Sequence, residues 1–191
     1  SVSLKKKFMK EQNQYTRKKE PELNRQLIID AATNIGAESD WSQVTFQAIA
    51  DRTGLSKGGI IHHFRNKEEL LDQLLNEGFM ELTDWVERYK KNHADKEGAF
   101  GYLDFVLNER KNDKYRKTMR VVLQAIMANP KYSAEWDKWY NKHIMPNGEE
   151  ISTKSLIICL IADGIWFGEN MNSKAYSKKD KERIIDYVKQ L

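Results

Sequence analysis

The sequence predicts an all-α protein. Apolar residues recur every three or four positions along nearly the whole chain, which is the spacing of a buried helix face. Only three prolines occur among the 191 residues, and none lies between Glu22 and Asn129. No run of alternating β-branched residues ends in an Asn-Gly or Asp-Gly turn, the usual mark of a β-hairpin. We therefore expect helices from end to end.

The first helix is expected over residues 22–35. Pro21 suits the start of a helix, since proline lacks the N–H that is unsatisfied there, and Gly36 can end the helix. The spacing places six apolar side chains on its inward face: Leu23, Leu27, Ile28, Ala31, Ala32 and Ile35.

Two short helices follow. The first is expected just after Thr45, and the second begins at Ser56 and ends near His63. Gly54 can adopt the left-handed backbone that turns the chain sharply between them, and Ala50 is small where the two helices cross. This is the arrangement of a helix-turn-helix.

A long helix is expected next. Asn66 and Glu69 resemble a capping box that opens it, and residues 67–91 would span about 37 Å as one helix. Further helical patterns cover residues 97–110, 115–128, 132–144, 149–171 and 178–190.

Composition limits the class of protein. The longest apolar run, residues 156–162, is too short for a membrane span of about 20 residues, and the N-terminus lacks an apolar signal core. The lone Cys159 excludes an internal disulfide and fits a reducing compartment. We therefore expect a cytoplasmic protein with no membrane partner.

Positive charge gathers at the N-terminus. Residues 1–20 carry seven lysines and arginines against two glutamates, whereas the remaining residues carry 25 positive and 26 negative charges. This arm is either a solubilising tail or a contact for a polyanion such as nucleic acid. Its weak apolar pattern disfavours a membrane surface.

The helix-turn-helix segment also carries groups that attract phosphate. Ser56 can cap the second short helix and leave its amide-rich end facing outward, with Lys57, Arg65 and Lys67 nearby. The pair His62 and His63 does not indicate a metal site, because adjacent side chains point apart and no cysteine or carboxylate lies nearby. We expect neither a metal nor a cofactor.

The segment TFQAIADRTGLSKGGIIHHFRNK, residues 45–67, resembles the TetR/AcrR family of bacterial one-component regulators. The matching residues are Ala31-Ala32, Thr45, Ile49-Ala50, Gly54-Leu55-Ser56-Lys57-Gly58, His63-Phe64 and Lys67. The chain departs from the pattern at Gly59, where many members have a hydroxyl or small side chain, and at His62, where many have tyrosine.

The resemblance implies roles by position. Thr45, Ser56, His63 and Lys67 are expected to contact phosphates, while Lys57, Gly58 and Gly59 are expected to face base edges in the major groove. His62 can still donate one hydrogen bond in place of the tyrosine. The expected domains are a basic arm over residues 1–20, a DNA-binding domain over 21–67, and a ligand-binding and dimerisation domain over 68–191.

The resemblance also implies a ligand pocket in the C-terminal domain, which is rich in large aromatic side chains. Core packing is the alternative for each single residue, and Asp163 is either a paired structural group or a pocket acid. The candidate ligand-binding residues are Trp85, Tyr89, Tyr102, Phe105, Met119, Leu123, Trp136, Trp139, Asp163 and Trp166.

The helices at 149–171 and 178–190 are the expected dimer interface, as they are in the family. The residues that recur at helical spacing there are Ile151, Ser155, Ile158, Ala162, Ile165 and Trp166.

These features together predict a homodimeric DNA-binding transcriptional regulator, a repressor that binds a palindromic double-stranded operator and is released by a small-molecule effector. The alternative among DNA binders is a nonspecific architectural protein. An enzyme is disfavoured, because the sequence contains no Gly-x-Ser-x-Gly, His-Glu-x-x-His, phosphate-binding glycine loop or nucleotide fingerprint.

Overall fold

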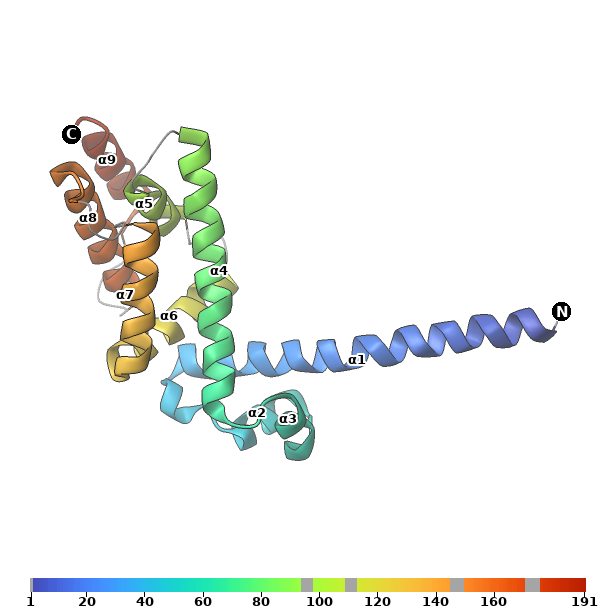
Figure 1. The fold of residues 1–191 in the computed structure, drawn as a ribbon. Coiled ribbons are helices and arrows are strands. Elements are labelled where there is room, and N and C mark those ends of the chain that lie inside the picture. The colour runs from blue at the N-terminus through green and yellow to red at the C-terminus, as the bar shows by residue number, and fades with distance from the viewer. Residues whose placement is uncertain (1, 94–97, 109–112, 145–149, 171–175) are drawn as a thin grey trace. The chain divides into compact units, whose positions relative to one another are not determined.

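The computed structural model describes residues 2–93, 98–108, 113–144, 150–170 and 176–191, and over residues 2–19 it describes the backbone alone. Every regular element in these ranges is a helix, which confirms the all-α prediction (Figure 1). Contacts divide the chain into two units, Ser1–Asp72 and Gln73–Leu191.

The N-terminal unit contains a helix-turn-helix. Its elements are α1 (Val2–Glu38), the 3₁₀ helix η1 (Trp41–Gln43), α2 (Phe46–Thr53), α3 (Lys57–His63) and the first residues of α4 (Lys67–His93). Helix α1 packs against η1, α2 and α3, and α2 packs against α3. The side chains of Ile28, Ala32, Ile49, Ile60 and Phe64 are fully buried.

The predicted limits of the first helix are wrong at both ends. Helix α1 begins at Val2 instead of Glu22 and continues through Pro21 and Gly36 to Glu38. Most residues before Pro21 are strong helix formers such as Lys, Glu, Gln, Met and Leu, and proline within a helix removes the one hydrogen bond that its N–H would donate. Gly36 is buried and keeps a negative φ, so it does not end the helix.

The predicted inward face of this helix is also partly wrong. Leu23 and Leu27 are 60% and 47% exposed, whereas Ile28 and Ala32 are fully buried. Successive helical residues are about 100° apart, so Leu27 lies on the flank of the face that Ile28 and Ala32 bury.

Local chemistry fixes both short helices. Thr45 caps α2, since its Oγ1 accepts a hydrogen bond from the Ala48 amide at 3.0 Å. Ser56 caps α3 in the same way, accepting from the Gly59 amide at 3.0 Å. Between them Gly54 has a φ of 73° and donates its N–H to the Ala50 carbonyl at 2.9 Å. These contacts confirm the helix starts and the turn that the sequence predicts.

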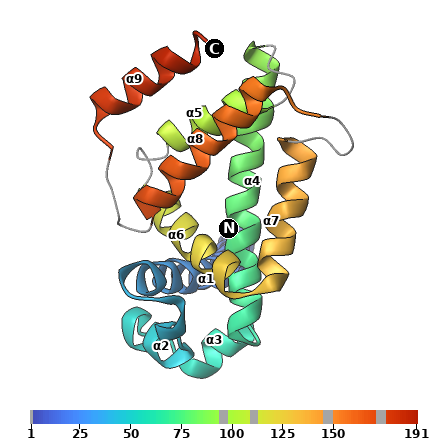
Figure 2. The ribbon, with the colours of Figure 1, turned by 90° about the vertical axis from the view of Figure 1, so that its left-hand side faces the viewer.

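The second unit packs five helices with most of α4. They are α5 (Ala99–Asn108), α6 (Asp113–Ala128), α7 (Pro130–His143), α8 (Thr153–Asn170) and α9 (Lys178–Val188). Helix α8 lies along α5, and α6 packs against both α7 and α8 (Figure 2). Tyr102, Met119 and Ile158 are at most 1% exposed and form part of the core between these helices.

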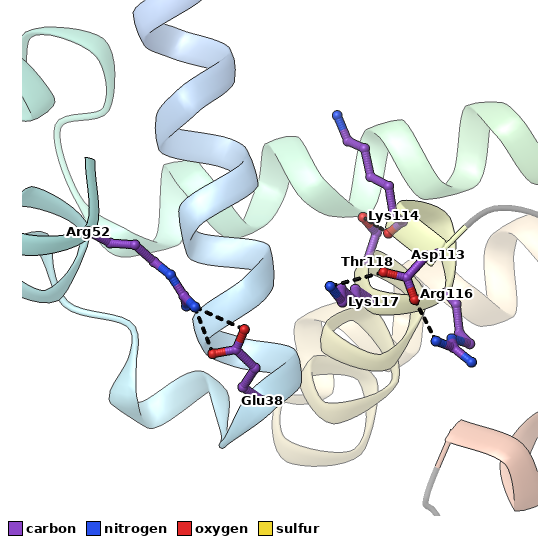
Figure 3. A network of polar contacts seen from close by, with 7 residues as sticks. All are labelled: Glu38, Arg52, Asp113, Lys114, Arg116, Lys117 and Thr118. Atoms are coloured by element: carbon purple, nitrogen blue, oxygen red, sulfur yellow. Dashed lines mark hydrogen bonds and ion pairs between the residues drawn. The ribbon is translucent and has the colours of Figure 1, made fainter. Parts of the chain in front are cut away.

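Ion pairs stabilise this unit both within one helix and between two helices. Asp113 at the start of α6 pairs with Arg116 and Lys117 one turn further on (Figure 3). Lys181 on α9 donates to Glu169 on α8 at 3.1 Å, and both side chains are almost completely buried. This buried pair holds α9 against α8.

Replacing Gly54 with alanine is expected to destabilise the protein by about 1–2 kcal/mol, because a Cβ disfavours the left-handed backbone although nothing lies within 4 Å of it. Gly58 is the matched control, since its Cβ would also meet nothing within 4 Å but its backbone is ordinary helix. Gly58→Ala should raise stability by up to about 1 kcal/mol. Denaturant midpoints of both variants measure this, and equal stability for Gly54→Ala and the parent would contradict it.

Candidate functional site

Helix α3 has one buried side and one open side. Ile60 is fully buried, as is Phe64, the residue that caps the helix. The opposite side exposes Lys57, Gly58, Gly59, Ile61 and His62. The helix is therefore anchored by its apolar residues and presents its other residues to the surroundings, as a recognition helix must.

The two glycines of this surface differ. A Cβ on Gly58 would meet nothing within 4 Å, so the backbone there is open. A Cβ on Gly59 would lie 3.2 Å from the capping Oγ of Ser56, closer than most such contacts. The nearby Ser56 cap is therefore a local structural reason for glycine at position 59. The DNA-facing role of Gly59 stays a prediction.

His63 and its neighbours form the edge of this surface. The Arg25 guanidinium lies 4.3 Å above the Phe64 ring. Burial, together with the charges of His62 and Arg25, lowers the pKa of His63. A neutral imidazole keeps one N–H, so His63 can donate one hydrogen bond to a phosphate at neutral pH.

Lys67 is held in place at the start of α4. Its Nζ donates to the Ser42 carbonyl at 3.3 Å and lies 5.2 Å from the centre of the Trp41 ring. Burial lowers the pKa of Lys67, and the nearby Asp40 carboxylate opposes that shift. An ammonium has three donors, so the contact with Ser42 leaves donors for a phosphate.

The N-terminus of α4 carries a variant of the predicted capping box. Asn66 Oδ1 accepts from the Glu69 amide at 2.8 Å, as the prediction requires. The Glu69 carboxylate, however, accepts from the Arg65 amide at 2.9 Å, one residue before the expected partner. This cap fixes the backbone from which Lys67 projects.

Arg52 has a structural partner. It donates two hydrogen bonds of 2.9 Å to the Glu38 carboxylate, which links α2 to the end of α1 (Figure 3). Both side chains are well exposed, so the pair contributes little stability and mainly orients the two helices.

The ten candidate ligand residues do not form one site. Five of them form a group that we call the Trp136 cluster. The Trp136 ring lies 5.4 Å from Trp139, 5.3 Å from Trp166 and 6.3 Å from Tyr102, and Tyr102 donates a hydrogen bond to Asp163. Trp85 instead packs on Phe105 at 5.8 Å, and its Nε1 donates to Asp104 at 3.0 Å.

The remaining three candidates lie elsewhere. Tyr89 stacks on His93 at 4.0 Å and lines a separate cavity of about 420 Å³ beside α5 and α9. Met119 and Leu123 are buried on α6, and Met119 Sδ lies 3.0 Å from where a Cβ of Gly78 would be.

One member of the Trp136 cluster was not among the candidates. The Tyr140 ring lies 6.0 Å from Trp136 and 6.1 Å from Tyr102. Its spacing of four residues from Trp136 on the same helix is the signal that could have found it.

Asp163 is the acidic member of this cluster. The Tyr102 hydroxyl donates to its Oδ1 at 2.8 Å, while burial raises the pKa of Asp163. Burial also raises the pKa of Tyr102 and of Tyr140, so both hydroxyls stay protonated. The cluster thus combines a carboxylate, neutral phenols and indole rings.

Most residues predicted for the dimer interface are buried within the single chain and so are not exposed for a partner. Ser155, Ile158, Ala162, Ile165 and Trp166 are buried inside their own unit, and Ile151 is half-buried. The apolar side chains exposed on α8, on α9 and just after α9 are Leu156, Ile157, Leu160, Phe167, Tyr187 and Leu191. We call this surface the α8–α9 apolar face. Helix α8 is apolar nearly all round, so spacing alone does not separate its two sides.

A helix-turn-helix with an outward recognition helix, joined to a second helical unit, defines a DNA-binding regulator. The family described as "Bacterial regulatory proteins, tetR family" matches residues 28–74, and the "Tetracyclin repressor-like, C-terminal domain" matches residues 97–191. The chain belongs to the TetR family of transcriptional regulators and is not an enzyme.

Sequence relatives are transcriptional regulators. The chain is 32% identical over 82 residues to the fatty acid metabolism regulator protein of Bacillus subtilis, covering 43% of this chain and 41% of that protein. It is 38% identical over 59 residues to the HTH-type transcriptional repressor KstR2 of Mycobacterium tuberculosis, covering 31% and 28%. The matched part is therefore less than half the length of either relative.

The fold is also shared with solved structures. A TetR-family member from Streptomyces coelicolor superposes with a TM-score of 0.61 at 15% identity, over 86% of this chain and 96% of that one. None of the described helices is both long and apolar enough to cross a membrane. In the same described residues, no three His, Cys, Asp or Glu side chains gather as metal ligands would.

We expect Lys67→Ala to weaken binding to specific and random DNA alike. Loss of one phosphate contact should reduce the log–log salt slope by about one per subunit bound. Lys67→Arg is the matched control and should keep the slope, because it keeps the charge. Salt titrations by fluorescence anisotropy measure both variants, and an unchanged slope in Lys67→Ala would remove Lys67 from the DNA contact.

Proposed function

We propose that the protein is a homodimeric repressor that binds a palindromic operator and is released from it by a small-molecule effector. The observation that carries this proposal is the open side of α3, which its buried residues hold outward. Phosphate contacts are assigned to Thr45, Ser56, His63 and Lys67. Contacts with base edges are assigned to Lys57, Gly58 and Gly59, with His62 beside them.

The α8–α9 apolar face supports the dimer. Leu160 and Tyr187 are each 63% exposed in the single chain. Contact with water is unfavourable for such large apolar side chains, and a partner subunit would cover them. A groove of about 880 Å³ runs between α8 and α9, lined by Leu160, Ile165 and Tyr187 among others. A two-fold dimer through this face matches an inverted repeat with half-sites about 34 Å apart or one turn more.

Helix α4 supports release by a ligand. It is one continuous helix that starts at Lys67 in the DNA-binding unit and runs on to His93. Near the middle of α4, Phe79 stacks on Trp139 at 6.3 Å, and Thr83 Oγ1 accepts from Trp139 Nε1 at 2.7 Å. A ligand that rearranges the Trp136 cluster therefore acts on α4, and a coupling of about 1–3 kcal/mol is typical of such systems.

The basic arm extends this DNA-binding surface. Residues 2–20 form the N-terminal part of α1. Their positive charges can bind phosphates of the DNA that flanks the operator. The side chains of residues 2–19 lie outside the described residues, so the arm is assigned here on charge alone.

Selection from a randomised DNA pool by the full chain tests this function. The expected result is an enriched inverted repeat bound by a dimer. Leu160→Glu should yield monomers by light scattering and weaken operator binding more than tenfold, because the charge faces the partner. Met80→Glu, an equally exposed apolar residue on α4, is the matched control and should stay dimeric. If no sequence is enriched, the proposal is wrong and the protein binds DNA without sequence specificity.

A further inference from the structure

Asp163 is a carboxylate without a cationic partner. The Tyr102 hydroxyl is its hydrogen-bond donor, and no Lys, Arg or His pairs with it among the described residues. Two turns further along the same helix, the buried Glu169 is paired with Lys181 at 3.1 Å. A partly buried carboxylate without such a partner costs stability, so its presence needs another reason.

Aromatic rings surround this carboxylate. Tyr102 and Tyr140 meet edge to face at 6.1 Å, and Trp136 stacks on Trp166 at 5.3 Å. Trp136, Tyr140 and Asp163 are only partly buried, so solvent reaches these three side chains, whereas Tyr102 and Trp166 are buried. Trp166 Nε1 is buried and has no hydrogen-bond partner in the described part of the chain, which leaves one donor unused.

We propose that Asp163, Tyr102, Trp136, Tyr140 and Trp166 bind an organic cation, a protonated amine or quaternary ammonium that carries apolar groups. A cation is attracted by the π-electrons of the partly exposed Trp136 and Tyr140 rings, and the Asp163 carboxylate supplies the opposite charge. This inference rests on the proposed ligand-released function, since it names the chemical class of that ligand.

A structural role for Asp163 makes a different prediction. If the residue only accepts the Tyr102 hydrogen bond, asparagine replaces it without functional loss. Because burial raises the pKa of Asp163, its ionised form is disfavoured in the fold, and stability rises as pH falls from above the folded pKa towards the unfolded one. The Asp163→Asn variant should therefore fold and be at least as stable as the parent protein at neutral pH. Its stability should lack the part of the pH dependence that Asp163 contributes.

Two probes of equal shape test the inference. Phenyltrimethylammonium and tert-butylbenzene differ only in the charged nitrogen, and tryptophan fluorescence with calorimetry reports binding of each to the full chain. The cation should bind at least tenfold more tightly. Asp163→Asn should lose that preference and keep the affinity for tert-butylbenzene. Asp137→Asn, which removes an exposed carboxylate beside Trp136, should leave both affinities unchanged.

Several results would overturn the cation site: no binding of the ammonium probe, equal affinity for the two probes, or cation binding that survives Asp163→Asn. Operator release is measured separately by adding the cation to the protein–DNA complex. Cation binding that depends on Asp163 but leaves operator affinity unchanged would support this site and contradict ligand release.

Ile61 carries a second, independent inference. It is 45% exposed in the middle of α3, while Ile60 and Phe64 bury the opposite side. It lies one turn after Lys57 on the open side of α3. In the major groove, apolar side chains contact the 5-methyl group of thymine. We infer that Ile61 reads a thymine methyl in each operator half-site.

Replacing single thymines of the selected operator with deoxyuridine removes only the methyl group. One position per half-site should lose about fourfold in affinity, the value for one buried methyl group. Ile61→Ala should abolish that difference, while Lys57→Ala should weaken binding to both DNAs and keep it. Equal binding of the thymine and uracil operators, or the same difference in Ile61→Ala, would overturn the assignment. Failure to select any operator would instead contradict the proposed function.

Discussion

The DNA-binding unit depends on the left-handed backbone of Gly54. Helix α2 ends at Thr53 and α3 starts at Lys57, so the chain must reverse within three residues. At φ 73° Gly54 closes α2 onto the Ala50 carbonyl and lets Ser56 cap the next helix. Because of this reversal, the side chains of Ile60 and Phe64 point into the core. Lys57, Gly58 and Ile61 stay exposed. A side chain at position 54 would therefore disturb the orientation of the whole surface.

The features that the sequence predicts well are those that a few neighbouring residues decide. The start of α2 after Thr45, the Ser56 cap and the Gly54 turn each involve hydrogen bonds that span at most four residues, so local chemistry is sufficient. The start of α1 is different, because Pro21 is compatible both with the beginning of a helix and with the interior of a long one. Only the helix-forming residues before it favour the second outcome.

The C-terminal unit shows where periodicity stops being informative. Helix α8 is apolar around most of its circumference, so spacing marks both the side that packs on α5 and the side that stays exposed. The sequence therefore selects Ile158 and Ala162, which are buried, and does not single out Leu160 and Phe167, which are exposed. The aromatic candidates divide for a similar reason, since contacts between α5, α7 and α8 decide which rings meet.

Asp163 and Glu169 show how one helix uses two partly buried acids differently. Glu169 is neutralised by Lys181 and fixes α9, which fits a structural pair. Asp163 accepts a hydrogen bond from the neutral phenol of Tyr102, and no cationic side chain among the described residues pairs with it. The Asp163 carboxylate is already desolvated and held in position in the folded protein. In the proposed site, a cation would therefore bind without an additional free-energy cost for ordering this carboxylate.

The ring stacked against that site also faces α4. Trp136 lies 6.0 Å from Phe79, so a cation beside Asp163 would contact a ring that already touches the helix leading to Lys67. A change in operator affinity then requires only that the cation bind one arrangement of this contact more tightly than the other.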